Sequence, residues 1–399
     1  MTELPSGHKR TQSGTHPWVK FHLDLTHVSY KLWMLLGEAF SKCQQIAGVP
    51  LLPETAEKLD HGFLVKGVHA TTSIEGNTLT EEQIEQQMKK TLVLPRSQQY
   101  LQQEVENILD ACAAIKRAIA KQQESTITVD TIKDLNALVL RKLPLDEEIV
   151  PGEFRRHSVG VLNYRGVPWK DCEKLTSRLC EWLSGADFES TEPRMQFALS
   201  LLQAVLAHLY IAWIHPFGDG NGRTARLVEF QILAQSGMVS LPTAHLLSNH
   251  YNITRARYYS ELDRSSKVDD GPIRFFEYAC EGFVDGLREQ LKVIKEQQLQ
   301  VTWEKYVQDQ FHDRRSPAIE RLKHILIDMP AEFISRKEIM AVSSRVTRDY
   351  AIKSEKTLTR DLNSLLRKKL INRSGTSYKP NRELILAFLP PNPPIHPLA

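Results

Sequence analysis

The stretch His215-Pro-Phe-Gly-Asp219-Gly220-Asn221-Gly222-Arg223-Thr-Ala-Arg226 is the most informative part of this 399-residue chain. It places a histidine, an aspartate, three glycines and two arginines within twelve residues. The proline after His215 disfavours helical angles at that histidine, so a helix should end there with the imidazole at the mouth of a loop. Glycines let the backbone turn tightly and approach a ligand closely. This combination predicts a phosphate-binding loop.

A helix is expected on each side of the loop. Segment 197–214 is apolar and carries no charged residue, which predicts a buried helix. A second helix is predicted from about Asn221 to a stop at Gly237. Its first turn offers N–H groups and the positive end of the helix dipole to an anion. Arg223 and Arg226 lie three residues apart and so share a face, where two guanidinium groups can clamp a polyphosphate.

Asp219 adds a carboxylate to the same loop. A lone carboxylate beside phosphate is a usual ligand of Mg²⁺, with phosphate oxygens and water completing the shell. Taken singly, the loop could be an ordinary glycine-rich turn and His215 a hydrogen-bonded residue at a helix end. Taken together, the groups favour a site, because two arginines and an aspartate would otherwise converge on nothing. A dinucleotide-binding fingerprint is excluded because the loop follows a helix, and a Walker loop because Gly-Lys-Ser/Thr is absent.

Every defined position of the stretch resembles the Fic family signature, His-x-Phe-x-Asp/Glu-Gly-Asn-Gly-Arg-x-x-Arg. The resemblance implies transfer of AMP from ATP to a Ser, Thr or Tyr hydroxyl of a target protein, or of the chain itself, with release of pyrophosphate. His215 would take the hydroxyl proton, a task for which an imidazole has a suitable pKa. Asp219 would hold Mg²⁺ on the phosphates. The residues implied to bind ATP phosphates are Gly220, Asn221, Gly222, Arg223 and Arg226.

One position of the signature bears on the type of reaction. Doc-like kinases of the family usually carry Lys where this chain has Gly222. Gly222 therefore favours adenylylation over phosphorylation. Phosphocholine transfer and the use of other nucleotides stay open, because the signature recognises the diphosphate more than what is attached to it.

The segment Thr71-Thr-Ser-Ile-Glu75-Gly76-Asn77 resembles the inhibitory motif of the family, Ser/Thr-x-x-x-Glu-Gly/Asn, in the class with an N-terminal inhibitory helix (class II). Gly76 is a natural helix stop, which puts Glu75 at a helix C-terminus, where the dipole disfavours a negative charge. The resemblance implies that Glu75 holds Arg226 and prevents productive seating of ATP. The alternative is a solvated glutamate at a helix end. In some relatives this glutamate also helps to remove AMP, so reversal stays open; the class further suggests a homodimer.

Two more segments are interpreted by the resemblance. Residues 158–166 carry β-formers and a turn, where the family has a hairpin flap whose edge can pair with an extended target segment. The residues assigned to the flap are Val161, Leu162, Asn163 and Tyr164. Tyr258 and Tyr259 resemble the paired tyrosines of the adenosine pocket, where an aromatic ring can stack on a purine. The alternatives are a plain surface hairpin and ordinary core packing.

The expected fold class is mainly α: a Fic helical fold with a small β-hairpin flap, followed by a winged helix-turn-helix domain. Length alone predicts two or three domains. The expected divisions are an N-terminal helical region 1–115 with the inhibitory motif 71–77, a Fic catalytic core 116–296, a linker helix 297–313 and a winged-helix domain 314–390.

Composition predicts a globular, soluble protein, with 41% hydrophobic and 25% charged residues. Segment 197–214 is long enough to suggest a membrane span, but we reject that because it runs directly into the glycine-rich loop. The five cysteines show no Cys-x-x-Cys spacing, which indicates reduced thiols and no zinc site. The polar start 1–14 does not resemble a signal peptide. We therefore expect a cytoplasmic protein that does not contact a membrane.

The C-terminal segment 314–390 differs in charge, with 17 Lys and Arg against 8 Asp and Glu, a net +9. Its pattern resembles a winged helix, in which the third helix enters the DNA major groove. The predicted elements are helices 318–328, 335–342 and 354–369, a hairpin over 370–379 and a strand over 384–389. The side chains expected to face bases or phosphates are Lys353, Lys356, Thr357, Thr359, Arg360 and Asn363, with Arg373 and Lys379 on the wing.

Two classes of function are consistent with these patterns. The first is a Fic adenylyltransferase whose basic C-terminal domain selects or tethers targets. The second is a DNA-binding regulator whose Fic site senses ATP or modifies the protein itself. A winged helix can also serve as a dimerisation or protein-docking module. Exposed Lys and Arg side chains can simply be solvated and bind no partner.

Overall fold

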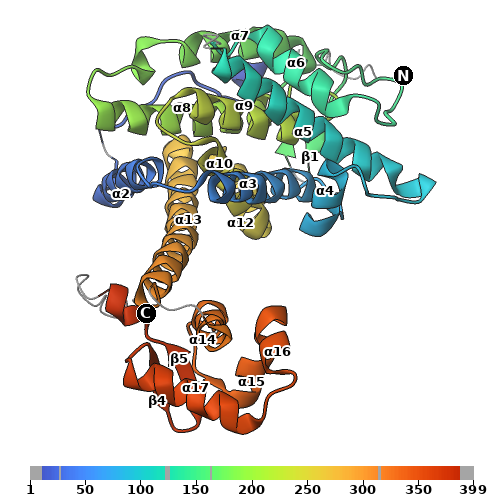
Figure 1. Cartoon of the computed structure of the whole chain (residues 1–399). Coiled ribbons are helices and arrows are strands. Elements are labelled where there is room, and N and C mark those ends of the chain that lie inside the picture. Colours follow the sequence, from blue (N-terminus) through green and yellow to red (C-terminus); the bar gives the residue numbers. More distant parts are fainter. Residues whose placement is uncertain (1–10, 27, 122–125, 162–163, 313–315, 387–399) are drawn as a thin grey trace, which may run out of the picture. The chain divides into compact units, whose positions relative to one another are not determined.

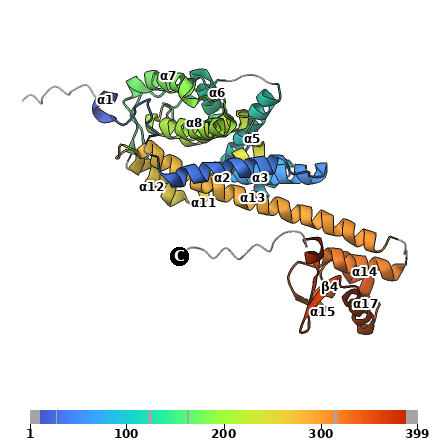
Figure 2. The same ribbon diagram turned by 90° about the vertical axis from the view of Figure 1, so that its left-hand side faces the viewer.

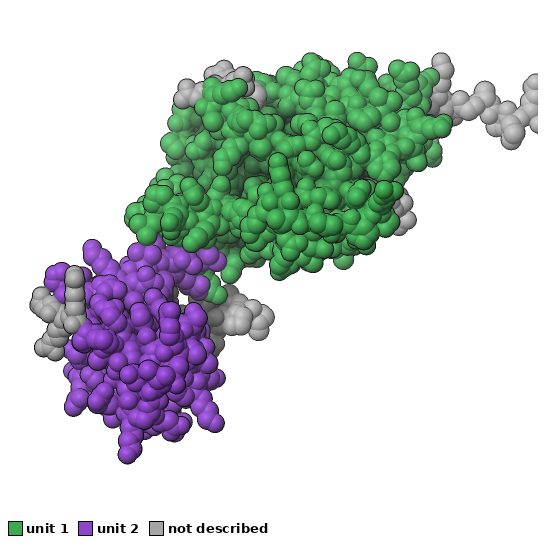
Figure 3. Space-filling view, turned by 45° about the vertical axis from the view of Figure 1, so that its right-hand side comes forward, with its two compact units in different colours: residues 1–292 green, residues 293–399 purple. Residues whose placement is uncertain are grey.

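The computed structural model describes residues 11–26, 28–121, 126–161, 164–312 and 316–386. The chain divides into two compact units, residues 1–292 and 293–399 (Figure 3). Each unit has its own hydrophobic core. They are described separately below.

The centre of the first unit is a pair of packed helices, α8 (Pro193–Ile214) and α9 (Asn221–Gln235). Figures 1 and 2 show α5, α6 and α7 on one side of α8 and α2 and α3 on the other. The surrounding helices are α1 (Gln12–Thr15), α2 (Tyr30–Ala47), α3 (Pro53–Ser73), α4 (Glu81–Met88), α5 (Gln99–Ala120), α6 (Val129–Leu140), α7 (Cys172–Leu183), α10 (Leu241–Ala244), α11 (Leu246–Ile253) and α12 (Arg255–Ser265). Short 3₁₀ turns occur at Arg96–Gln98, Trp169–Asp171 and Ala186–Phe188. The fold is mainly helical, as predicted.

Helix α8 is apolar because it forms the core. Within the described residues it is the one helix long and apolar enough to cross a membrane, with a mean hydropathy of 1.8 over 18 residues, but 89% of that window is buried inside the protein. A buried core helix passes the same length and composition test, since it also has no polar face.

A small hairpin lies between α6 and α7 in the sequence. Strand β1 (Gly160–Val161) pairs antiparallel with β2 (Tyr164–Arg165), with Gly160 opposite Arg165 and Val161 opposite Tyr164. The prediction of a hairpin here is confirmed for the strands. Two of the residues assigned to the flap, Leu162 and Asn163, lie outside the described residues.

The long helix α13 (Gly271–Gln310) begins in the first unit and ends in the second. Its last turns bury Trp303 and Val307 in the second core, together with Phe311 directly after the helix. Segment 297–313, expected to be a linker helix, therefore contributes to that core. The expected division between 115 and 116 falls inside α5, because this helix packs as one piece on the first core.

The second unit combines short helices with a three-stranded sheet of order β3-β5-β4. Its elements are α14 (Pro317–Asp328), β3 (Ile334–Ser335), α15 (Arg336–Met340), α16 (Ser344–Tyr350), α17 (Glu355–Arg367), β4 (Ile371–Ser374), β5 (Ser377–Pro380) and a 3₁₀ turn at Arg382–Ile385. β5 pairs antiparallel with both neighbours, placing Tyr378 opposite Ile334 and Arg373.

Three features of this unit differ from the sequence expectation. Helix α16 and strand β3 were not expected. The predicted strand over 384–389 is wrong in its described part, which is a 3₁₀ turn over 382–385. Both edges of β5 are already paired with β3 and β4, and the backbone N–H of Leu384 bonds to the carbonyl of Asn381 at 3.3 Å, so the aliphatic residues turn back locally. Tertiary context here overrides β-propensity.

Candidate active site

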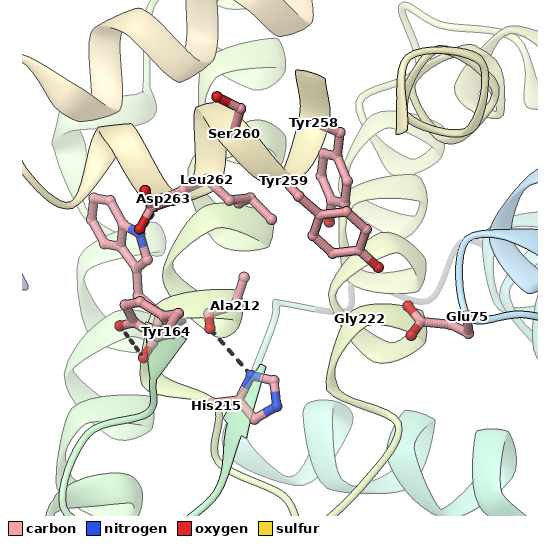
Figure 4. Close-up of a pocket in the computed structure, with 11 residues that line it drawn as sticks. Glu75, Tyr164, Ala212, His215, Gly222, Tyr258, Tyr259, Ser260, Leu262 and Asp263 are labelled. Atoms are coloured by element: carbon pink, nitrogen blue, oxygen red, sulfur yellow. Dashed lines mark hydrogen bonds between the residues drawn. The ribbon is translucent and has the colours of Figure 1, made fainter. Parts of the chain in front are cut away.

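His215 ends helix α8 in a left-handed conformation, with φ 51° and ψ 60°. Its backbone N–H still bonds to the carbonyl of Ile211 at 2.8 Å, and Pro216 follows. A non-glycine residue in this region of backbone space is strained and persists only where its surroundings fix it. The left-handed turn directs the imidazole toward the open space shown in Figure 4.

Arg155 supplies much of that fixation. This arginine is 3% exposed, and its guanidinium donates to the carbonyls of His215 at 2.6 Å, His157 at 2.7 Å and Val167 at 2.5 Å. Its backbone N–H bonds to the carbonyl of Pro216 at 3.0 Å. One buried cation thus joins the segment before the hairpin, the segment after it and the loop after α8.

Two asparagines shape the glycine-rich loop from inside. The Asn221 side chain accepts from the N–H of Phe217 and donates to its carbonyl, both at 2.9 Å. Asn136 on α6 donates to the carbonyl of Asp219 at 3.0 Å and accepts from the N–H of Gly152 at 3.0 Å. The Asn221 amide, which the resemblance implies to cradle phosphates, already bonds to the loop backbone through both of its polar atoms and so braces the loop directly before α9.

The His215 imidazole is neutral over the physiological range. Burial lowers its pKa from 6.5 to about 4, although the carbonyl of Ala212, 3.3 Å from Nδ1, acts in the opposite direction. A neutral ring that donates Nδ1–H to this carbonyl leaves Nε2 with a free lone pair. His215 is therefore able to accept a proton at Nε2.

Glu75 and Arg226 form an ion pair across the site. Glu75 follows the end of α3, and its Oε1 accepts from Arg226 Nη2 at 2.6 Å. Arg226 also donates from Nε to Thr71 Oγ1 at 2.8 Å and from Nη2 to the Thr71 carbonyl at 2.9 Å. Burial alone would raise the pKa of Glu75, but Arg226, Arg223 and His215 outweigh it and lower that pKa. The carboxylate is therefore ionised and held on the arginine, as the inhibitory motif predicts.

The two arginines of the signature are not equivalent. The Arg226 side chain is 1% exposed, and its Nη1 has no hydrogen-bond partner in the described part of the chain. Arg223 is 5% exposed and donates from Nη1 to Glu104 Oε1 at 2.9 Å, with Nη2 3.4 Å from Asp219 Oδ1. Arg223 is thus paired with two carboxylates and Arg226 with one, and each keeps one buried guanidinium nitrogen, Nε and Nη1 respectively, without a hydrogen-bond partner among the described residues.

Gly222 allows Glu75 to reach the start of α9. A Cβ atom at position 222 would lie 2.3 Å from Glu75 Oε1, closer than atoms tolerate. The carboxylate thus occupies space next to the first turn of α9, where helix N–H groups lack intrahelical acceptors and favour an anion. A larger residue at 222, such as the lysine of Doc-like kinases, would displace Glu75 from this position.

Asp219 is the available carboxylate for a divalent cation. Its side chain is 46% exposed at the loop. Among the described residues no group of three or more His, Cys, Asp or Glu side chains could hold a metal by itself. A single half-exposed carboxylate fits a cation that is shared with phosphate oxygens, and does not fit a structural metal site.

A cavity of about 290 Å³ opens on one side of His215 (Figure 4). Tyr258 and Tyr259 of α12 line it, together with Ala212, Trp213 and Leu262. The Tyr258 hydroxyl is turned into the core and bonds to His208 Nε2 at 2.9 Å. The tyrosines offer ring surface in an apolar cavity near the lower end of the ~300–1,000 Å³ typical of small-molecule sites.

A second cleft lies on the hairpin side of His215. It is lined by Ser158, Val159 and Gly160 before and in β1, by Asp146 and Glu148, and by residues 218–222 of the loop. Tyr164 of β2 belongs to the first cavity and is anchored by a bond from its hydroxyl to the Trp213 carbonyl at 2.7 Å. His215, Glu75 and Gly222 line both hollows, so the imidazole stands where they meet.

Most residues singled out in the sequence converge on this place, and three further residues do as well. Arg155, Asn136 and Glu104 hold the loop and its arginines from distant segments. No local pattern marks them, because a buried Arg or Asn is recognised only from its partners. Arginine is seldom fully buried, so the burial of Arg155 marks it as a residue with a specific role. That burial is visible only in the structure.

Comparisons with known proteins agree with the geometry. Residues 126–233 match the model of the Fic/DOC family. The chain is 29% identical over 220 residues to "Protein adenylyltransferase Fic" of Nematostella vectensis, covering 55% of this chain and 47% of that protein. It is 27% identical over 207 residues to "Protein adenylyltransferase fic-1" of Caenorhabditis elegans, covering 51% and 37%. The chain thus spans less than half the length of these relatives.

Solved structures share the fold. A Fic family protein from Desulfovibrio desulfuricans G20 superposes with a TM-score of 0.56 at 20% identity, covering 90% of this chain and 98% of that one. Residues 134–508 of Fic-1 from C. elegans give a TM-score of 0.52 at 22% identity, covering 67% and 73%. Sequence match, fold and converging signature residues agree for the part of the chain that matches the Fic/DOC family model, residues 126–233.

Proposed function

We propose that the chain is a protein adenylyltransferase, which transfers AMP from ATP to a Ser, Thr or Tyr hydroxyl of a target protein and of itself. The observation that carries the proposal is the position of His215 between an apolar, tyrosine-lined cavity and a cleft bordered by the hairpin. A nucleoside in the cavity and a target hydroxyl in the cleft would meet at Nε2. The names of the relatives support the same activity.

The chemistry follows from the protonation state of His215. Its neutral Nε2 accepts the hydroxyl proton while the target oxygen forms a bond to the α-phosphorus of ATP. The bond from that phosphorus to the bridging oxygen breaks, and pyrophosphate leaves with the electron pair. The first-turn N–H groups of α9 and the unpaired Nη1 of Arg226 would stabilise phosphate charge. The protein contributes mainly position and electrostatics.

Asp219 would hold Mg²⁺ on the phosphates. The cation supplies charge neutralisation on the polyphosphate when it is bound. Within the protein, Asp219 would exchange its long contact with Arg223, 3.4 Å, for the cation. This exchange would leave Arg223 paired with Glu104 and with phosphate.

Glu75 would inhibit the enzyme in this state. It occupies Arg226 and the space beside Gly222, both of which an ATP phosphate needs. We further propose that the same carboxylate can orient water for removal of AMP. All five cysteines are buried free thiols, which supports the expectation of a reducing, cytoplasmic environment.

Labelled ATP with Mg²⁺ tests the proposal directly. Label should appear on protein, increase in Glu75→Gly, and fall by about 10²–10⁴-fold in a Glu75→Gly, His215→Ala double variant, the usual contribution of a general base. His250→Ala, which changes a histidine that lines neither hollow, is the matched control. Labelling that persists without His215 would overturn the proposed chemistry.

A second candidate function concerns the second unit, which we propose to be a winged-helix module that binds DNA. Helix α17 buries Leu358, Leu362 and Leu365 and presents a polar, mainly basic face. A shallow groove on that face is lined by Glu355, Lys356, Thr359, Arg360, Asn363, Leu366 and Arg367. The two predicted wing residues already have partners within the protein. Arg373 donates to the Gly375 carbonyl at 2.7 Å, and Lys379 pairs with Glu383 at 3.1 Å.

A shift assay with duplex DNA at several salt concentrations tests this function. Affinity should fall as salt rises, because phosphate contacts release counterions. Lys356→Ala and Arg360→Ala should each reduce the salt slope by about 1, whereas Lys295→Ala on α13 should not. Binding that ignores salt, or that responds equally to Lys295→Ala, would count against DNA contact.

A further inference from the structure

Asn77 anchors the turn that carries Glu75. Two residues after the glutamate, this side chain is 5% exposed and uses its polar atoms fully. Nδ2 donates to the Leu101 carbonyl at 2.9 Å and to Glu104 Oε2 at 2.8 Å, and Oδ1 accepts from the N–H of Leu79 at 3.0 Å. The turn after α3 is therefore attached by side-chain bonds to helix α5.

Glu104 holds a second element with its other oxygen. Oε1 accepts from Arg223 Nη1 at 2.9 Å, and the glutamate side chain is only 17% exposed. Arg223 lies one turn before Arg226 on α9. A single carboxylate thus connects the turn carrying Glu75 to the helix carrying the arginine that Glu75 grips.

The backbone of this turn is closed locally onto the end of α3, since the N–H groups of Glu75 and Asn77 bond to the Thr72 carbonyl at 3.1 and 3.2 Å. Gly76 has φ 99°, a conformation natural to glycine, and the Glu75 side chain is 29% exposed. These local bonds do not reach α5, whereas those of the Asn77 side chain do. The 2.6 Å contact between Glu75 and Arg226 depends on where the turn is held. A hydrogen bond weakens steeply once distance and angle leave the normal range, so a small displacement of the turn would release Arg226.

We propose that Asn77, Glu104 and Arg223 form an inhibitory clasp: Glu104 is a positioning residue that sets the geometry of Glu75 on Arg226 and thereby the strength of inhibition. The proposal rests on the proposed function, since it concerns regulation of the same site. Glu104 acts through its two partners and touches neither nucleotide nor target in this role.

The clasp predicts an effect on ATP binding that depends on Glu75. A merely structural role of Asn77 or Glu104 predicts no such dependence. Loosening the turn should matter only while Glu75 is present. Asn77→Ala should therefore tighten ATP binding on the order of 5-fold, the lower range of allosteric couplings. In a Glu75→Gly background the same substitution should leave ATP affinity unchanged. This dependence is a double-mutant coupling.

Glu104→Gln provides an isosteric second variant in case Asn77→Ala folds poorly. The amide cannot accept from both Asn77 and Arg223 with equal strength, because one of its two atoms is a donor. We expect tighter ATP binding than in the unmodified chain, again only with Glu75 present. Glu106→Gln, an exposed carboxylate on the same helix, is the matched control and should have no effect.

The experiment measures ATP affinity with Mg²⁺ by titration calorimetry on the full chain. The variants are the unmodified chain, Asn77→Ala, Glu104→Gln and Glu106→Gln, each with and without Glu75→Gly, with thermal unfolding as a check of folding. Amide hydrogen exchange at residues 74–79 should quicken in the two clasp variants. Equal effects in both backgrounds, or none beyond Glu106→Gln, would overturn the clasp.

Failure of the clasp and failure of the proposed function give different results. If Glu75→Gly binds ATP more tightly and becomes labelled while the clasp variants behave like Glu106→Gln, only the clasp is wrong. If Glu104→Gln weakens ATP binding equally in both backgrounds, Glu104 serves Arg223 alone. If no variant, including Glu75→Gly, binds ATP, the adenylyltransferase proposal itself fails.

Discussion

Each unit buries an arginine against a carboxylate, and the two pairs differ in what surrounds them. In the second unit, Arg321 and Asp361 are 10% and 7% exposed, 3.1 Å apart, and the Tyr350 hydroxyl also donates to Asp361 at 2.8 Å. In the first unit, Glu75 is 29% exposed while Arg226 is 1% exposed and retains an unused Nη1. The Asp361 carboxylate is enclosed and accepts from both Arg321 and Tyr350, whereas the Glu75 carboxylate lies at the edge of a cavity.

This difference separates a structural ion pair from an exchangeable one. Asp361 joins α14, α16 and α17 inside a core, where no other anion can replace it. Glu75 reaches Arg226 from a turn, beside a cavity that a ligand can enter. The same kind of ion pair is enclosed in the core of the second unit and borders a cavity in the first, where the proposed function would use it for control. The following predictions test that contrast.

The largest expected effect is on stability in the second unit. Asp361→Ala should lower its free energy of unfolding by about 3–5 kcal/mol, because Arg321 is left as an uncompensated buried charge. Urea unfolding of the full chain, followed by tryptophan fluorescence, measures the loss. Arg360→Ala, its exposed neighbour, should change stability by less than about 0.5 kcal/mol. A loss of stability below about 1 kcal/mol in Asp361→Ala would show that water compensates the charge of Arg321. The Arg321–Asp361 pair would then not differ from the Glu75–Arg226 pair.

A smaller loss is expected from Glu75→Gly in the first unit. Arg226 keeps its bonds to Thr71 and can meet water in the cavity, so we expect about 1 kcal/mol, the lower cost of an unsatisfied donor. ATP with Mg²⁺ should recover the loss, by about 2.7 kcal/mol at 100 times its Kd. Thermal unfolding with and without ATP measures both. A loss as large as that of Asp361→Ala, unrelieved by ATP, would make the pair structural.

The smallest expected effect is the response of activity to mild acid. The pKa of His215 lies near 4, so its neutral, basic form persists well below pH 6.5. Labelling by Glu75→Gly should stay nearly constant from about pH 8 to about pH 5.5, where a histidine of ordinary pKa would already be mostly protonated. Initial rates across this range measure it. A half-maximal rate near pH 6.5 would show that the imidazole is solvated and not buried.

The same shift has a consequence for folding, with a definite sign. The folded pKa is depressed, so the unfolded chain binds the proton first as the pH falls below 6.5. Stability should therefore decrease between about pH 6.5 and pH 4, and circular dichroism at each pH separates this loss from a change in rate. The His215→Ala variant should lack this part of the pH dependence.

The candidate site was predictable where its residues are close in sequence. His215, Asp219 and Arg226 lie within one loop and one helical turn, so spacing alone brings them together. Glu75 was recognisable by a local motif, although 151 residues separate it from Arg226. A local pattern does not show that the Asn221 side chain bonds to both the N–H and the carbonyl of Phe217, which only the folded loop reveals.

In the second unit, periodicity located α14 and α17 because apolar residues recur at regular spacing there, and a glycine turn located the β4–β5 hairpin. The same reasoning missed β3, two residues long, and α16, since elements this short carry too little periodic signal. It predicted a strand at 384–389, whose described part forms a 3₁₀ turn because β5 is already paired on both edges.

The sequence by itself determined the helical class, the residues of the signature loop and the glutamate that reaches Arg226, since each is marked by residues near one another along the chain. The tertiary structure decided which donors stay unused, which carboxylate is exposed, and that Arg155, Asn136 and Glu104 hold the site. These properties depend on burial and on long-range partners, because the energy of a polar group is set by what surrounds it after folding.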